Sequence, residues 1–164
     1  EGDDAETAFY IGSLFAEVEL NDNFAVGIDV VPMSMDSETT ENVQGGIAGE
    51  KTNKVDVTFE NMMSAYITVK ADTGVYAKLG YVEVDVATNE VLGTGGAYAN
   101  TDIDGYTIGL GYDRELNDGA FVRLEANYID LDGASLTNSN DSTKSVTADG
   151  VDGYGARISV GKAF

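Results

Sequence analysis

The sequence of 164 residues contains no cysteine, no histidine, no tryptophan and a single proline. Without cysteine there is no disulfide framework, and without both cysteine and histidine the usual zinc sites and all thiol or imidazole chemistry are excluded. Basic side chains are also scarce, with 9 against 29 acidic ones and a formal net charge of −20. Because phosphates and anionic membrane surfaces are bound by clustered Lys and Arg, we expect neither a nucleic-acid partner nor a polybasic membrane anchor.

Long hydrophobic runs are absent too. No stretch approaches the roughly 18 apolar residues of a membrane-spanning helix. The opening Glu1-Gly2-Asp3-Asp4 has no initiator Met and no apolar segment, so we expect that a signal peptide has been removed or never existed.

What the sequence does contain is alternation of apolar and polar residues with a period of two, typical of β-strands with two different faces. The alternation predicts strands at 8–20, 24–34, 54–70, 75–86, 105–116, 120–132 and 152–164. Short turns at 21–23, 71–74 and 117–119 alternate with long polar loops at 35–53, 87–104 and 133–151. This alternation of short and long connections is typical of outer-membrane β-barrels.

The two faces of these segments differ along their whole length. In 54–70 the odd positions from Val55 to Val69 are mostly apolar, and the even positions from Asp56 to Lys70 are mostly polar. The polar faces mix glycine with isolated charges of both signs, as a narrow barrel interior needs, since small residues leave room and opposite charges pair. The charges predicted to form this interior network are Glu17, Asp29, Lys78, Arg123, Glu125 and Arg157.

The C-terminal end is the most specific motif. Counting back from Phe164 in steps of two gives Lys162, Val160, Ile158, Ala156 and Tyr154. The stem of Lys162 can lie along lipid while its ammonium group reaches water. An aromatic last residue that follows apolar residues at alternate positions resembles the C-terminal assembly signal of bacterial outer-membrane β-barrels. The layout of the whole chain is similar to the small OmpA-type and opacity-type porin-like members of that group.

The resemblance implies a location in the bacterial outer membrane and contact with its lipid and lipopolysaccharide. It also implies that the barrel-assembly machinery reads Tyr154, Ile158, Val160 and Phe164. The expected fold is all-β, a single antiparallel up-and-down transmembrane β-barrel. Because such barrels have even strand numbers and seven strands are visible here, we expect an eighth strand before residue 1. A strand from a neighbouring chain and a misread segment are the alternatives.

A barrel of eight strands is wide enough only for its own side chains. We therefore expect a structural or interaction protein that presents acidic loops outward. We do not expect an enzyme, because enzymatic outer-membrane barrels rely on a histidine. Three alternatives stay open: a soluble, lipocalin-like protein that binds a small ligand, a narrow cation-preferring channel, and a self-associating surface protein.

Two further groups of residues concern the strand ends. Asp102-Ile103-Asp104-Gly105 and Asp130-Leu131-Asp132-Gly133 resemble fragments of calcium loops, although neither continues to the glutamate at the twelfth position. They indicate at most weak Ca²⁺ binding, or cation bridging to lipopolysaccharide phosphates, at the outer rim. The alternative is an acidic rim that is simply solvated. No other cofactor is expected. Candidates for interfacial aromatic girdles are Tyr10, Phe24, Tyr81, Tyr112, Phe121, Tyr128, Tyr154 and Phe164.

Overall fold

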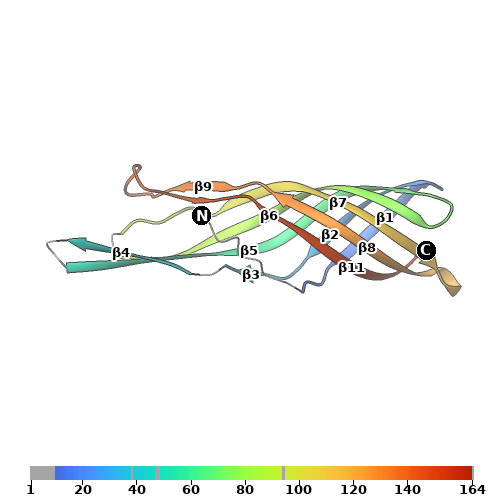
Figure 1. Ribbon diagram of the computed structural model, residues 1–164, viewed down its shortest axis with the longest axis horizontal. Helices are drawn as coiled ribbons and strands as arrows, with labels where there is room; N and C mark the ends of the chain where they lie inside the picture. Colours follow the sequence, from blue (N-terminus) through green and yellow to red (C-terminus); the bar gives the residue numbers. More distant parts are fainter. Residues whose placement is uncertain (1–9, 38, 47–48, 94, 164) are drawn as a thin grey trace.

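The computed structural model describes residues 10–37, 39–46, 49–93 and 95–163. Within these ranges the regular structure is β, apart from one short 3₁₀ turn, η1 (Asn117–Gly119). The main sheet follows the chain in a meander (Figure 1), and each strand is antiparallel to the next. Its strands are β1 (Leu14–Asn21), β2 (Phe24–Val31), β5 (Gly49–Lys70), β6 (Val75–Leu92), β7 (Thr101–Glu115), β8 (Ala120–Leu131) and β11 (Val151–Lys162). The expected all-β, antiparallel up-and-down order is confirmed.

Short turns connect the strands at one end of the sheet, which we call the turn end. The side chain of Asn21 accepts hydrogen bonds from the backbone N–H groups of Asn23 and Phe24 and so closes the turn between β1 and β2. Gly74, with a φ of 88°, and Asp118, with a φ of 61°, supply the left-handed backbone of the other two turns. These turns fix the register of the three hairpins.

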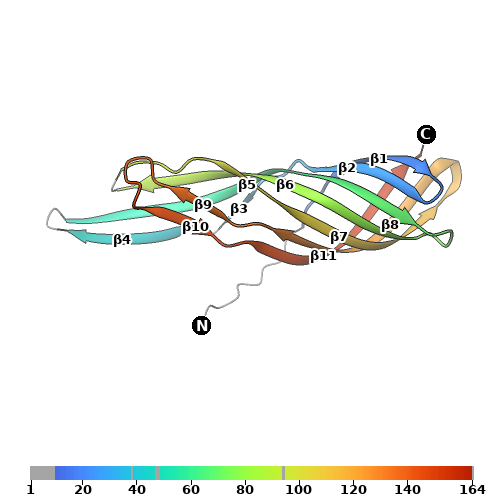
Figure 2. The same ribbon diagram turned by 90° about the horizontal axis from the view of Figure 1, so that it is seen from above.

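At the opposite end, which we call the loop end, much of the predicted loop structure is wrong because the strands continue. β5 and β6 stay paired out to Asn53 and Leu92. β3 (Met35–Asp36) and β4 (Thr40–Gly46) add to the edge of β5, and β9 (Ala134–Thr137) forms a separate hairpin with β10 (Ser145–Ala148). The hairpin of β4 and β5 projects well beyond the other strands (Figure 2).

The sheet curves back on itself but remains open in the described residues. β1 and β11 are its edges, and no pairing joins them there. The expected closure into a barrel is therefore not made by these strands. Both edge strands run toward the turn end, so pairing them directly would place a parallel contact in an antiparallel sheet. Side chains cross the gap instead: the Arg157 guanidinium on β11 donates a hydrogen bond of 2.6 Å to the Ser13 hydroxyl, next to β1.

A β-bulge in β5 exchanges the two faces of that strand. The register with β6 shifts between Glu60 and Met63, and Asn61 has a positive φ of 50°. One extra residue reverses the direction of every side chain beyond it. The prediction that the odd positions of 54–70 form one apolar face along the whole length is therefore wrong, because these positions lie on opposite sides of the sheet before and after the bulge. Met63 points outward, whereas Phe59 points into the curve of the sheet.

The reversed part of β5 contributes to an apolar core at the loop end. Val82, Val84, Val86, Ile103 and Leu131 are buried there. Partly buried apolar side chains pack around them, namely Val57, Phe59, Met62, Ile129 and Ala134. The loop end thus has the apolar inside and polar outside of an ordinary water-soluble β-structure.

Candidate functional site

The outer face of the turn-end half is apolar on every strand of the main sheet. We call this surface the apolar band. It comprises every second residue from Leu14 to Leu20 (β1), Phe24 to Val30 (β2), Met63 to Val69 (β5), Val75 to Tyr81 (β6), Tyr106 to Tyr112 (β7), Val122 to Tyr128 (β8) and Tyr154 to Val160 (β11). Leu110 is 65% exposed and Ile158 is 75% exposed. Continuous apolar surface of this extent marks a face that contacts something other than water.

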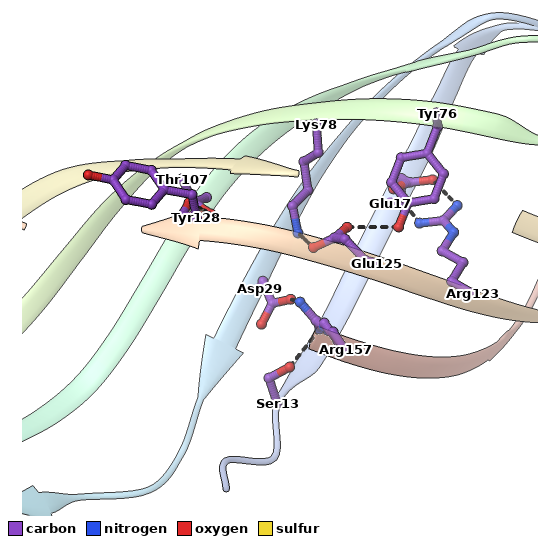
Figure 3. Close-up of polar contacts among 10 residues, drawn as sticks. All are labelled: Ser13, Glu17, Asp29, Tyr76, Lys78, Thr107, Arg123, Glu125, Tyr128 and Arg157. Carbon is purple, nitrogen blue, oxygen red and sulfur yellow. Dashed lines mark hydrogen bonds and ion pairs between the residues drawn. The ribbon is translucent and has the colours of Figure 1, made fainter. Parts of the chain in front are cut away.

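The inner face of the same half carries charges (Figure 3), and among them Arg123 on β8 binds two carboxylates. Its guanidinium donates two hydrogen bonds to the carboxylate of Glu17 on β1, of 2.7 and 2.9 Å. Its Nε donates a third, of 2.9 Å, to Asp113 on β7. The bidentate contact joins strands that are far apart in the sheet order, so it holds the sheet in its curved form.

The remaining predicted charges form two more pairs in the interior. Lys78 pairs with Glu125, and both side chains are at least nine-tenths buried. The Tyr76 hydroxyl donates a hydrogen bond of 2.7 Å to the same carboxylate. Arg157 pairs with Asp29 (Figure 3). The structure therefore brings all six predicted charges together as three ion pairs, which we call the charge network.

Two interior charges were missed by sequence reasoning. Asp113 is buried and pairs with Arg123, and the Lys70 ammonium lies 3.5 Å from the same carboxylate. The signal for Asp113 was available, because it follows Gly109 and Gly111 on the polar face of its strand. Lys70 is the last residue of β5 and lies beside a turn, where charged side chains are usually exposed to solvent, so its sequence position gave no reason to place it in the interior.

Glycines on the inner face make room for large rings. A Cβ atom on Gly27 would lie 2.4 Å from the ring of Tyr66, and one on Gly111 would lie 2.5 Å from the ring of Tyr76. The interior is consequently filled by its own side chains. The cavities described beside Arg123 each have room for about one water molecule.

The polarity of both faces reverses along a row of four tyrosines, Tyr81, Tyr106, Tyr128 and Tyr154, which we call the tyrosine belt. Tyr81 is opposite Tyr106, and Tyr128 is opposite Tyr154. The next outward residues toward the loop end are all acidic, namely Glu83, Asp104, Asp130 and Asp152. The Tyr106 hydroxyl donates a hydrogen bond of 2.9 Å to Asp130. The belt thus separates an apolar outer surface from an acidic one.

The turn end has its own border residues. Phe24 and Tyr112 face outward there, and the next outward positions on β7 and β11 are Arg114 and Lys162. Phe121 was predicted to belong to an aromatic girdle, and this is wrong: it faces inward, with its ring centroid 4.9 Å from the Arg123 guanidinium carbon and 6.1 Å from that of Phe15. Tyr10 is exposed ahead of β1.

The predicted assembly signal lies on the free edge of the sheet. Tyr154, Ile158 and Val160 point outward from β11 and are exposed, whereas Phe164 is outside the described residues. The predicted calcium-binding carboxylates lie at the start of β7 and the end of β8. Asp102 faces Asp85 across the sheet, Asp104 faces Glu83, and Asp130 faces Asp152.

The acidic rim does not assemble a metal site: in the part of the chain that the structure describes, no three acidic side chains are grouped so that they could hold a metal ion. Asp132, which follows β8, contributes a backbone hydrogen bond to Asp104.

The loop end is ordered by hydrogen bonds between connections. The backbone N–H of Ser139 donates to the carbonyl of Ala97, and the Ser139 hydroxyl accepts from the Ala97 N–H, both at 2.9 Å. In the same connection, hydrogen bonds from Thr143 hold the pKa of Asp141 below its ordinary value. The connection between β6 and β7 is thus tied to that between β9 and β10.

No protein-family model matches the sequence, and no match is found among curated proteins or solved structures. Across the described ranges, no helix is long and apolar enough to cross a membrane.

Proposed function

We propose that this protein is an integral β-barrel protein of the bacterial outer membrane, with a structural or interaction role and a narrow interior filled by side chains. The observation that carries the proposal is the inverted polarity of the turn-end half. Apolar side chains cover its outside, and buried ion pairs fill its inside. In water this arrangement exposes the surface that normally drives folding, whereas in lipid it satisfies both faces.

The borders of the apolar band support this proposal. Tyrosine and phenylalanine are enriched where a protein crosses from hydrocarbon to headgroups. The band is bordered by the tyrosine belt on four strands at the loop end, and by Phe24 and Tyr112 at the turn end. Carboxylates follow directly beyond the tyrosine belt, and long cationic side chains that can reach headgroups follow at the turn end. The loop end, with its apolar inside, then lies in water.

The open sheet edge is accounted for by one further strand. Unpaired backbone groups cannot remain in hydrocarbon, since each costs several kcal/mol. Because β1 and β11 run in the same direction, one strand antiparallel to both closes the sheet with an even strand number. The contact between Arg157 and Ser13 suits a gap of two strand spacings, about 10 Å.

The alternatives receive less support. A lipocalin-like protein needs a ligand cavity, and here the cavities beside Arg123 hold about one water molecule each. A channel needs an open path, but ion pairs cross the turn-end interior and the apolar core fills the loop end. The partners of the proposed protein are therefore outer-membrane lipid and lipopolysaccharide around the band, and the assembly machinery at the exposed residues of β11.

Gel mobility in cold detergent tests the proposal. Closed outer-membrane barrels stay folded in cold SDS, so we expect unboiled protein extracted from membranes to migrate differently from boiled protein. Full solubility without detergent, together with identical migration of both samples, would contradict the membrane assignment and favour a water-soluble β-protein.

A further inference from the structure

The apolar band is short. On each strand it covers seven residues, for example Tyr106 to Tyr112 on β7 and Val122 to Tyr128 on β8. Six steps along a strand span about 20 Å, and a strand tilt of 35–45° reduces their height to roughly 15 Å. Transmembrane strands typically use about 9–11 residues, for an apolar height of about 25 Å. The band of this protein is therefore two to four residues shorter on each strand, which corresponds to one or two outward rows.

The limit at the loop end is sharply defined. Glu83 and Asp104 face each other directly beyond the tyrosine belt, and Asp130 and Asp152 do the same on the next pair of strands. Carboxylates on a short stem cannot extend several ångströms to reach water, as lysine and arginine do. Sinking this row into hydrocarbon would bury neighbouring like charges, which is costly.

The limit at the turn end is softer but also close. Arg114 and Lys162 are the next outward residues on β7 and β11, and their apolar stems can lie in hydrocarbon. Asp22 and Asp72 occupy the two other short turns at the same level. Side-chain reach at both borders adds a few ångströms, which brings the usable height to about 20 Å.

We infer that the lipid partner of this protein is a bilayer with a hydrocarbon layer of about 20 Å, thinner than the average of about 30 Å. In a thicker bilayer the lipid around the protein must thin, because a rigid sheet with charged borders cannot lengthen. This inference rests on the proposed membrane function and adds to it the kind of membrane that the surface fits.

The test measures equilibrium stability against bilayer thickness. The full chain is folded into phosphatidylcholine vesicles with acyl chains of ten, twelve, fourteen, sixteen or eighteen carbons, and the urea midpoint is followed by far-UV circular dichroism. We expect the highest midpoint at ten or twelve carbons. In vesicles with chains of eighteen carbons, the folding equilibrium constant should be smaller than at this maximum by a factor of roughly ten or more. The reason is that the mismatch penalty accumulates with each ångström of extra thickness.

Two matched double variants separate band length from other effects of thin lipid. Glu83→Leu with Asp104→Leu adds one apolar row directly above the belt on β6 and β7, so the preferred chain length should increase. Asp85→Leu with Asp102→Leu removes the same charge from a facing pair one row farther out, where the new leucines do not join the band. This control should keep the preference of the parent protein.

The outcomes distinguish this inference from the proposed function. A maximum at sixteen or eighteen carbons, or the same preference in both double variants, would overturn the thin-bilayer inference. A protein that forms no β-structure in any vesicle or in detergent micelles, which adapt to the length of a band, would overturn the membrane function and the inference with it.

Discussion

Replacement of Arg123 by methionine is expected to destabilise the folded protein by about 3–5 kcal/mol, the usual cost of breaking a buried ion pair by removing one partner. The guanidinium is the common partner of Glu17 and Asp113, and its side chain is 13% exposed. Without it, two carboxylates remain in the interior with little solvent around them. Strain is not the cause, since methionine fits where an arginine stem was.

Urea unfolding in detergent micelles, followed by circular dichroism, measures this loss. Lys144→Met is the matched control, because its pairing with Asp141 is solvent-exposed and such pairs contribute about 0–1 kcal/mol. If Arg123→Met prevents folding, the triple variant with Glu17→Gln and Asp113→Asn should restore a large part of the stability. Equal unfolding midpoints for Arg123→Met and Lys144→Met would contradict a structural role for the charge network.

Arginine in place of Leu110 is expected to destabilise the protein in lipid by about 2–4 kcal/mol, the cost of a cation on the lipid-facing wall near the bilayer midplane. Leu110 lies in the middle rows of the band and is opposite Ala77 and Ala126. In a water-soluble protein the same change at a 65% exposed position would be close to neutral. The sign and size of the effect therefore depend on what surrounds the wall.

Val43→Arg provides the control for this substitution. Val43 is 57% exposed on β4, in the loop-end extension beyond the tyrosine belt. Both variants are refolded into phosphatidylcholine vesicles and titrated with urea. A lower midpoint is expected for Leu110→Arg alone, whereas equal midpoints for the two variants would argue against lipid contact.

Much of the sheet follows directly from the sequence. Alternation at a period of two determines which face each residue occupies, so opposite charges spaced through the polar faces were found as a group before their partners were known. The pairs themselves were not predictable. Glu17 meets Arg123 across 106 positions of sequence, and only the curvature of the sheet brings those strands together.

The errors also have physical causes. Asn61 adds one residue to β5. The adjacent Met62 and Met63 place an apolar residue on either face at this point, so the sequence pattern does not show where the two faces exchange. Polar strands such as β4 are held by backbone pairing with β5, and backbone hydrogen bonds have no sequence pattern of their own. Phe121 lies at a strand end, where an aromatic side chain can either face outward at the membrane border or face inward and pack against a cation.

Direct contact between the apolar band and lipid can be measured most cleanly because the chain contains no cysteine. Single cysteines at Leu110 on the band, and at Asp102 and Val43 beyond the belt, would each carry a small fluorescent label in phosphatidylcholine vesicles with brominated acyl chains. A lipid-facing wall predicts strong quenching of the label at Leu110 and little at Asp102 and Val43. Equal quenching at all three positions, or none at Leu110, would contradict it.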